Sequence, residues 1–172
     1  KGVERESSNL YSAEIYFKKS DYIRAEECYS GALRENSNNA AAFHDRGSAR
    51  KLINKLEEAA ADYNEAIRLN PRMTMAYLNL ASVYRNLQKL EESLAEYHQA
   101  VRLEPENVLA LNNRGYVYFL MGKYTEAEKD FREAIRIDPQ YAFAHNNLAG
   151  ALIKQERFQE AIPFADKAIA LN

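Results

Sequence analysis

The chain has 172 residues, of which 47% are hydrophobic and 28% charged, and its formal net charge is −2. This composition is typical of a folded globular protein and excludes an intrinsically disordered one. Basic and acidic residues (23 and 25) are interspersed without a basic stripe, which disfavours nucleic acid as a partner. No apolar run approaches the roughly 20 residues that span a bilayer, so we expect no membrane span.

The N-terminus and the single cysteine say little about the compartment. Residues 1–6 are charged and lack the apolar segment of a signal peptide. They also lack an initiator Met, so we expect a processed chain or a fragment of a longer one. Cys28 cannot form an internal disulfide. The localisation stays unknown, and the cytoplasm is the default assumption when no signal peptide is seen.

Three of the four prolines reveal an internal repeat. Pro71, Pro105 and Pro139 are spaced by 34 residues, and each ends a similar phrase of the form Ala-apolar-Arg-apolar-polar-Pro. The phrase recurs one period earlier with Ser37 in place of the proline. A fixed period of this size indicates a stack of similar supersecondary units. It predicts one continuous array over residues 1–172, made of units 6–39, 40–73, 74–107, 108–141 and 142–172.

Each unit is predicted to form two helices joined by a short polar turn. The first helix is clearest at 75–84, and the second at 91–103 and 125–137, where apolar residues recur with helical periodicity. We expect Gly122 to end one first helix in the left-handed conformation. The three prolines should end the second helices of their units. No segment alternates with period two, so we predict an all-α fold.

Residues of one kind recur at fixed positions of the five units. The eighth position is always small, and the twenty-fourth holds a ring in all units but the last: Ala13, Gly47, Ala81, Gly115, Ala149; Tyr29, Tyr63, Tyr97, Phe131, Ala165. Small residues allow two helices to approach closely. We expect the ring to fill the space between one hairpin and the next.

This pattern resembles the tetratricopeptide repeat family, in which small, aromatic and proline residues recur over 34 residues. The fourth unit carries the pattern in Leu111, Arg114, Gly115, Tyr118, Ala127, Phe131, Ala134 and Pro139. The resemblance extends over 6–172, and the first unit departs most from it. It implies a right-handed superhelical solenoid of five stacked helix-turn-helix hairpins. The first helices would line a concave groove, and the second helices, with Asp62 and other acidic residues outward, would face solvent.

The resemblance implies a protein or peptide ligand in that groove. The residues expected to bind it are His44, Met75, Leu78, Asn79, Arg85, Leu109, Asn112, Asn113, Tyr116, Phe119, Phe143, Asn146 and Asn147. Five of them form an Asn ladder: Asn79, Asn113 and Asn147 share one repeat position, and Asn112 and Asn146 share the position before it. An amide offers donors and an acceptor to a peptide backbone. The same amides can instead bind a neighbouring helix, and the sequence leaves both interpretations open.

Other sites are disfavoured. The clamp of this family for the C-terminal carboxylate of chaperones needs Lys, Asn and Arg at set positions of three consecutive units. Only its Asn is present in any frame, so we expect no such clamp. His44, His98 and His145 occupy different repeat positions without metal-ligand spacing. We expect no catalytic residue, no metal, no cofactor and no enzymatic activity.

Three functions remain as hypotheses. The first is a protein–protein interaction scaffold that binds an extended peptide or a helix of a partner. The second is self-assembly into a homo-oligomer, in which the last repeat stacks on another copy through Phe158, Ile162, Phe164, Ala165 and Ile169. The third is the targeting arm of a larger multidomain enzyme.

Overall fold

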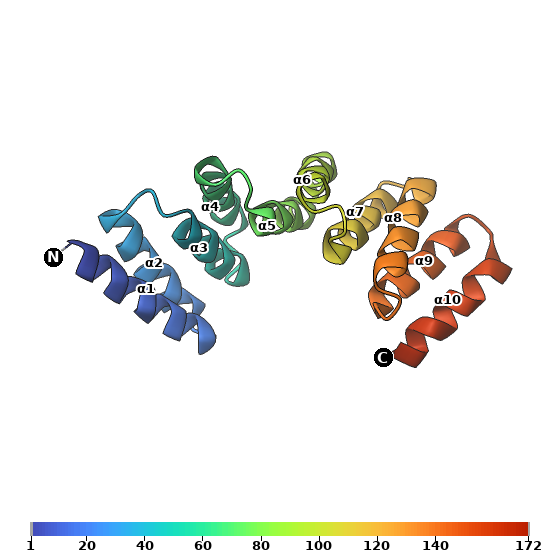
Figure 1. Cartoon of the computed structure of the whole chain (residues 1–172), viewed down its shortest axis with the longest axis horizontal. Helices are drawn as coiled ribbons and strands as arrows, with labels where there is room; N and C mark the ends of the chain where they lie inside the picture. Colours follow the sequence, from blue (N-terminus) through green and yellow to red (C-terminus); the bar gives the residue numbers. More distant parts are fainter. Residues whose placement is uncertain (1, 172) are drawn as a thin grey trace. The chain divides into compact units, whose positions relative to one another are not determined.

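The structure is a computed structural model that describes the backbone of residues 2–171 and the side chains of residues 6–171. All regular structure in this range is helical, with ten helices and no strand (Figure 1). The helices are α1 (Gly2–Lys18), α2 (Tyr22–Glu35), α3 (Ala40–Leu52), α4 (Leu56–Leu69), α5 (Thr74–Asn86), α6 (Leu90–Leu103), α7 (Val108–Leu120), α8 (Tyr124–Ile137), α9 (Ala142–Lys154) and α10 (Phe158–Leu171). The predicted all-α helical repeat fold is confirmed.

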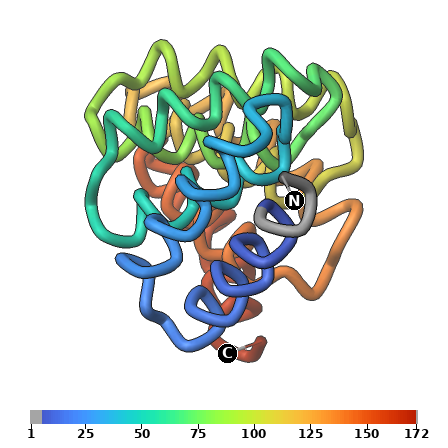
Figure 2. The backbone as a smooth tube through the Cα atoms, turned by 90° about the vertical axis from the view of Figure 1, so that its left-hand side faces the viewer, coloured from blue at the N-terminus to red at the C-terminus, as the bar shows by residue number. Residues whose placement is uncertain are grey.

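The chain forms two compact units, Lys1–Gln88 and Lys89–Asn172. In the first unit, α1 packs on α2 and α3 packs on α4, while α2 contacts α3 and α4 contacts α5. Figure 2 shows α1 and α2, in blue, lying side by side. Two core clusters of this unit each combine alanines with one buried tyrosine, Tyr29 in one and Tyr63 in the other, and the second also contains Leu80 and Val83. In the second unit, α7 packs on α8 and α9 packs on α10, while α6 contacts α7 and α8 contacts α9.

Close contact between a glycine and a ring holds two of the hairpins together. A Cβ atom added to Gly115 would lie 2.8 Å from Cε1 of Phe131, and one added to Gly47 would lie 3.0 Å from Cε1 of Tyr63. Both rings are fully buried. The small eighth position therefore lets the first helix approach the ring of the second helix, as expected from the sequence.

Buried ion pairs join neighbouring helices of the first unit. Arg46 donates two hydrogen bonds to the Asp62 carboxylate, at 2.9 and 2.7 Å, and Arg50 donates a third at 2.9 Å. Arg50 also donates to Glu26 on α2 at 2.9 Å. Asp62 is only 2% exposed, so the expectation that it faces solvent on the outer wall was wrong. Its charge is retained in the interior because two guanidinium groups pair with it.

Ion pairs of the same kind recur two and three repeat periods later in the chain. Arg114 donates two hydrogen bonds of 2.7 Å to Asp130, as Arg46 does to Asp62. Glu26 accepts a hydrogen bond from Lys55, and Glu128 accepts one from Arg157, in each case from a residue 29 positions further on. Burial raises the pKa of Glu26, but hydrogen bonds from Lys55 and Arg50 outweigh it and lower the pKa overall. Charged groups therefore join successive helices at repeating positions.

Every turn between a first and a second helix contains one residue with positive φ. These residues are Ser20 (60°), Asn54 (62°), Gln88 (60°), Gly122 (75°) and Glu156 (60°). The prediction for Gly122 is confirmed, and the other four are not glycines. An L-residue in this region brings its Cβ atom too close to the following carbonyl oxygen, at a cost of roughly 1–2 kcal/mol. At Ser20, Gln88 and Glu156 the turn geometry is therefore imposed by the packing of the two helices, whereas Gly122 and Asn54 are residue types that favour it locally.

We expect the substitution Glu156→Gly to raise the free energy of unfolding by about 0.5–1 kcal/mol, because glycine adopts positive φ without this clash. Gly122→Ala should lower it by about 1 kcal/mol, since no atom lies within 4 Å of the added Cβ and only the backbone conformation is affected. Lys129→Gly, at an exposed site inside α8, is the matched control and should be destabilising. Urea denaturation followed by circular dichroism measures all three. A destabilised Glu156→Gly variant would contradict the explanation.

Candidate functional site

The structure divides the thirteen residues predicted to bind a peptide by their exposure. Met75, Leu109, Phe143 and Asn146 are exposed; His44, Asn79, Arg85, Asn113, Tyr116, Phe119 and Asn147 are half-buried; Leu78 and Asn112 are buried. All of them lie on first helices of hairpins, namely α3, α5, α7 and α9. We call the surface that these helices present in each unit the first-helix surface of that unit.

In the second unit, four of the predicted residues line one pocket of about 200 Å³, the α7–α9 pocket. Its lining consists of Tyr116, Phe119, Asn146, Asn147 and Gly150. The rings of Tyr116 and Phe119 are stacked, with centroids 6.2 Å apart and planes 6° from parallel. The absence of a side chain at Gly150 helps to keep the space open, because an added Cβ would lie 3.8 Å from Phe119. The pocket thus combines an apolar wall with two amide groups.

The amides of this unit form a chain of hydrogen bonds. Asn147 on α9 donates to Oδ1 of Asn112 on α7 at 2.9 Å, and Asn112 donates to Oδ1 of Asn113 at 3.4 Å. Asn112 is 5% exposed, so its amide serves the contact between two helices. Asn146 is exposed and makes no hydrogen bond to any other residue that the structure describes. Among the four amides of this unit, those of Asn112, Asn113, Asn146 and Asn147, the Asn146 amide therefore has the most hydrogen-bonding capacity left for a ligand.

A similar bridge occurs in the first unit. Nδ2 of Asn79 on α5 lies 3.0 Å from Nε2 of His44 on α3, and Nδ1 of His44 lies 2.9 Å from the Asp45 carboxylate. A neutral His44 with its proton on Nδ1 satisfies both contacts, since it donates to Asp45 and accepts from Asn79. The two residues of this bridge are 35 positions apart, as are Asn112 and Asn147. This repeated spacing is the pattern expected if Asn79 and Asn147 bind a neighbouring helix.

Lys51 and Arg85 add positive charge to the first-helix surface of the first unit. Lys51 lies on α3 and Arg85 on α5, and both are half-buried. Burial lowers the pKa of Lys51, and the positive charge of Arg85 lowers it further. Leu78, on the same helix as Arg85, is 7% exposed and belongs mainly to the interior.

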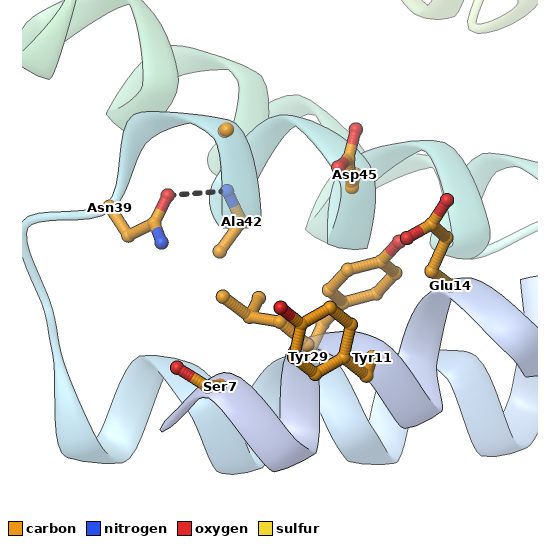
Figure 3. A pocket seen from close by; sticks show the side chains of 9 residues that line it. Ser7, Tyr11, Glu14, Tyr29, Asn39, Ala42 and Asp45 are labelled. Carbon is orange, nitrogen blue, oxygen red and sulfur yellow. Dashed lines mark hydrogen bonds between the residues drawn. The ribbon is translucent and has the colours of Figure 1, made fainter. Parts of the chain in front are cut away.

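A second pocket, of about 300 Å³, lies on the first-helix surface of the first unit. We call it the α1–α3 pocket; it is lined by Ser7, Leu10, Tyr11, Glu14, Tyr29, Asn39, Ala41, Ala42 and Asp45 (Figure 3). Sequence analysis did not select these residues as a site. Tyr29 belongs to the column of rings assigned to packing, and its partners come from two other helices. Only the assembled unit brings them together.

The five residues predicted to mediate self-association lie on α10 in two different environments. Phe158, Ile162 and Ile169 are exposed. Phe164 and Ala165 pack against the core cluster around Phe131 and Leu148 instead. The exposed three are spaced by four and seven residues, so they share one face of the helix.

No three His, Cys, Asp or Glu side chains within residues 6–171 gather into a group able to hold a metal ion. None of the helices in the described part of the chain is long and apolar enough to cross a membrane.

Sequence comparison gives matches to family models along most of the chain. A model described as tetratricopeptide repeat matches residues 12–73 and 44–97, and the two matches together cover residues 12–97, which is half of the chain. Others with the same description match residues 108–141 and 146–172, and one described as TPR repeat matches residues 81–122. The chain belongs to the tetratricopeptide repeat family. No curated protein matches it significantly in sequence.

Several solved structures of tetratricopeptide repeat proteins and of MamA have the same fold. MamA superimposes with a TM-score of 0.90 at 20% identity, over 98% of this chain and 92% of that chain. A tetratricopeptide repeat protein from Parabacteroides merdae gives 0.89 at 24% identity, over 97% and 66%. YrrB, described as a TPR protein with an unusual peptide-binding site, gives 0.80 at 23% identity, over 95% and 84%. At these identities the likeness shows the fold alone.

We expect Asn112→Ala to lower the free energy of unfolding by about 1–3 kcal/mol, because it removes a buried amide and leaves the Asn147 donor without its acceptor. Asn146→Ala is the matched control, since it removes an adjacent but exposed amide from α9, and it should change stability by no more than about 0.5 kcal/mol. Thermal and urea denaturation measure both variants. Equal effects would show that the chain of amides does not hold α7 and α9 together.

Proposed function

We propose that the chain is a protein-interaction scaffold that binds an extended peptide or a helix of a partner protein on its first-helix surfaces. The observation that carries this proposal is the α7–α9 pocket, where the amides of Asn146 and Asn147 lie beside the stacked rings of Tyr116 and Phe119. The amides can hydrogen-bond a polypeptide backbone, and the rings can bury an apolar side chain of the ligand.

Exposed apolar side chains on the first-helix surfaces of both units support the same function. Phe143 on α9 is 67% exposed, and Leu109 on α7 and Met75 on α5 are also largely exposed. A single exposed apolar residue needs no explanation, but here three occur on first helices that also carry the Asn ladder. Contact with a partner would remove this surface from water.

The hydrogen bonds among the amides refine the role of the Asn ladder. Asn79 and Asn147 each use one donor hydrogen to hold a neighbouring first helix. An amide group has a second donor hydrogen and a carbonyl oxygen, so each retains capacity for a ligand while the bridge limits its side-chain motion. Asn112, being buried, would act by positioning Asn147 rather than by contacting the ligand.

YrrB gives independent support, because a protein with the same fold is described as having a peptide-binding site. The Asn ladder, the tetratricopeptide fold and the exposed apolar residues together favour a polypeptide ligand over a small metabolite. At about 200 Å³, the α7–α9 pocket also suits one side chain of a larger ligand rather than a whole cofactor.

The test uses peptides selected from a random-sequence library on the intact chain, with binding measured by fluorescence polarisation. We expect the double variant Asn146→Ala, Phe143→Ala to weaken binding at least about tenfold, a loss of about 1.4 kcal/mol. Both side chains are exposed, so the midpoint of thermal denaturation should change little. Lys129→Ala with Glu133→Ala on α8 is the control on a second helix and should bind as the unchanged chain does. Unchanged affinity of the first double variant would contradict the proposal.

Self-association through α10 is the second candidate function, favoured by the exposed row of Phe158, Ile162 and Ile169. Ile162 occupies the repeat position at which Glu26 and Glu128 contact the following helix pair. The row therefore lies on the face that in earlier hairpins contacts the next one, and a second copy of this chain could cover it.

We expect the molar mass from light scattering to rise with protein concentration if copies associate in this way. Ile162→Lys with Ile169→Lys should then abolish the rise, because each places a charge in an apolar contact. Leu120→Lys, at another exposed apolar site, on α7, should leave it unchanged. A constant monomer mass over the whole concentration range would reject self-association.

A further inference from the structure

The α1–α3 pocket combines apolar walls with acidic groups. Leu10 and Tyr11 come from α1, and Ala41 and Ala42 come from α3. The carboxylates of Glu14 on α1 and Asp45 on α3 also line it. A third carboxylate, that of Glu6, lies close by, because it accepts a hydrogen bond of 3.2 Å from the lining residue Asn39. The pocket has the dimensions of one long side chain and a negative rim.

The two acidic groups are only partly used within the protein. Glu14 pairs through Oε1 with Lys18, at 2.7 Å, on the exposed surface of α1. Asp45 contacts His44 through Oδ1. The second oxygen of each carboxylate has no hydrogen-bond partner among the residues that the structure describes. The ion pair with Lys18 is a weak surface pair that an incoming cation can replace or join.

Tyr29 brings to the same pocket a hydroxyl group without a partner in the described part of the chain. Its side chain is 5% exposed, yet its hydroxyl makes no hydrogen bond to another described residue. Figure 3 shows the Tyr29 ring directed toward Glu14 and Asp45, with Tyr11 in front of it. Burial, together with the charges of Asp45 and Glu14, raises the pKa of Tyr29 to about 12, so the hydroxyl keeps its proton. The hydroxyl is therefore a donor and acceptor that remains open to a ligand.

A cationic side chain satisfies all of these groups at once. Its methylene groups would pack on Leu10 and the two alanines. Its N–H groups would donate to the open oxygens of Glu14 and Asp45 and to the Tyr29 hydroxyl, and charged pairs of this kind make strong hydrogen bonds. Tyr11 is exposed at the mouth of the pocket, where its ring can contact the cation through a cation–π interaction. An apolar side chain would leave the hydroxyl unpaired, and a carboxylate would be repelled.

We propose that the α1–α3 pocket binds a lysine or arginine side chain of the partner polypeptide and so makes the scaffold selective for basic segments. This inference rests on the proposed function, because it names the chemistry of part of the same ligand. Its charge preference is opposite to that of a clamp for a C-terminal carboxylate, and it assigns a ligand role to Tyr29, Glu14 and Asp45.

The first experiment needs no partner. We expect the amide signals of Ala41 and Ala42 in the NMR spectrum of the intact chain to shift on titration with N-acetyl-arginine amide. The neutral isostere N-acetyl-citrulline amide should cause no comparable shift. In the variant Glu14→Gln, Asp45→Asn, the response to the arginine derivative should be lost. Glu57→Gln with Glu58→Gln, which neutralises two exposed acids at the start of α4, is the matched control and should retain it.

Tyr29→Phe tests the hydroxyl without removing the ring. Phe131 fills the equivalent repeat position and is fully buried, so a phenyl ring suits the packing. We expect this variant to denature as the unchanged chain does and to bind the arginine derivative more weakly. Equal responses to the arginine and citrulline derivatives, or a full response in the Glu14→Gln, Asp45→Asn variant, would overturn the proposal.

Peptides selected from the random-sequence library separate this inference from the proposed function. We expect them to carry a lysine or arginine whose replacement by citrulline or acetyl-lysine weakens binding to the unchanged chain at least about tenfold. The same replacement should have little effect in the Glu14→Gln, Asp45→Asn variant. Selected peptides that show no preference for a basic residue would reject the α1–α3 pocket and leave the scaffold function standing. Failure to select any peptide, with a normal response to the arginine derivative, would reject the scaffold function alone.

Discussion

The close approach of a small residue on a first helix to a ring on the second helix, which the structure shows at Gly47 and Gly115, is the constraint on which the packing of the hairpins depends. At Gly115 and Gly47 the ring lies so near that a methyl group would need displacement of Phe131 or Tyr63. This contact fixes the separation of the two helices in a hairpin. The turn between them must then be short, which explains why residues such as Gln88 and Glu156 adopt positive φ despite their side chains.

Polar groups then determine how one hairpin meets the next. Asp62 is bound by Arg46 and Arg50, and Glu26 is bound by Arg50 and Lys55, so charged groups link α2, α3 and α4. Such pairs contribute less to stability than apolar packing, because both charges lose water. Their geometry is nevertheless directional, and it favours one alignment of successive helices over others that would leave a buried charge unpaired.

The fold could be predicted from the sequence because its signals repeat with one period, and agreement among the repeats removes most local ambiguity. The prolines, the small residues and the rings each recur at fixed positions, and Gly122 marked a left-handed turn residue. The sites were harder to predict, because hydrophobic periodicity shows which side of a helix is polar but not what a polar group contacts. Asp62 was therefore placed in solvent, although its partners stand 16 and 12 residues earlier in the chain.

The Asn ladder shows why a column of identical residues does not have one role. Asn112 and Asn146 occupy the same repeat position, yet Asn112 is buried between α7 and α9 and Asn146 is exposed beside a pocket. The difference arises because Asn112 has Asn147 on the next first helix as a donor. Hydrogen-bonding capacity is finite, so groups that hold helices together have less left for a ligand. By the same reasoning, the Tyr29 hydroxyl, which binds no other described residue, keeps its full hydrogen-bonding capacity for a ligand in the α1–α3 pocket.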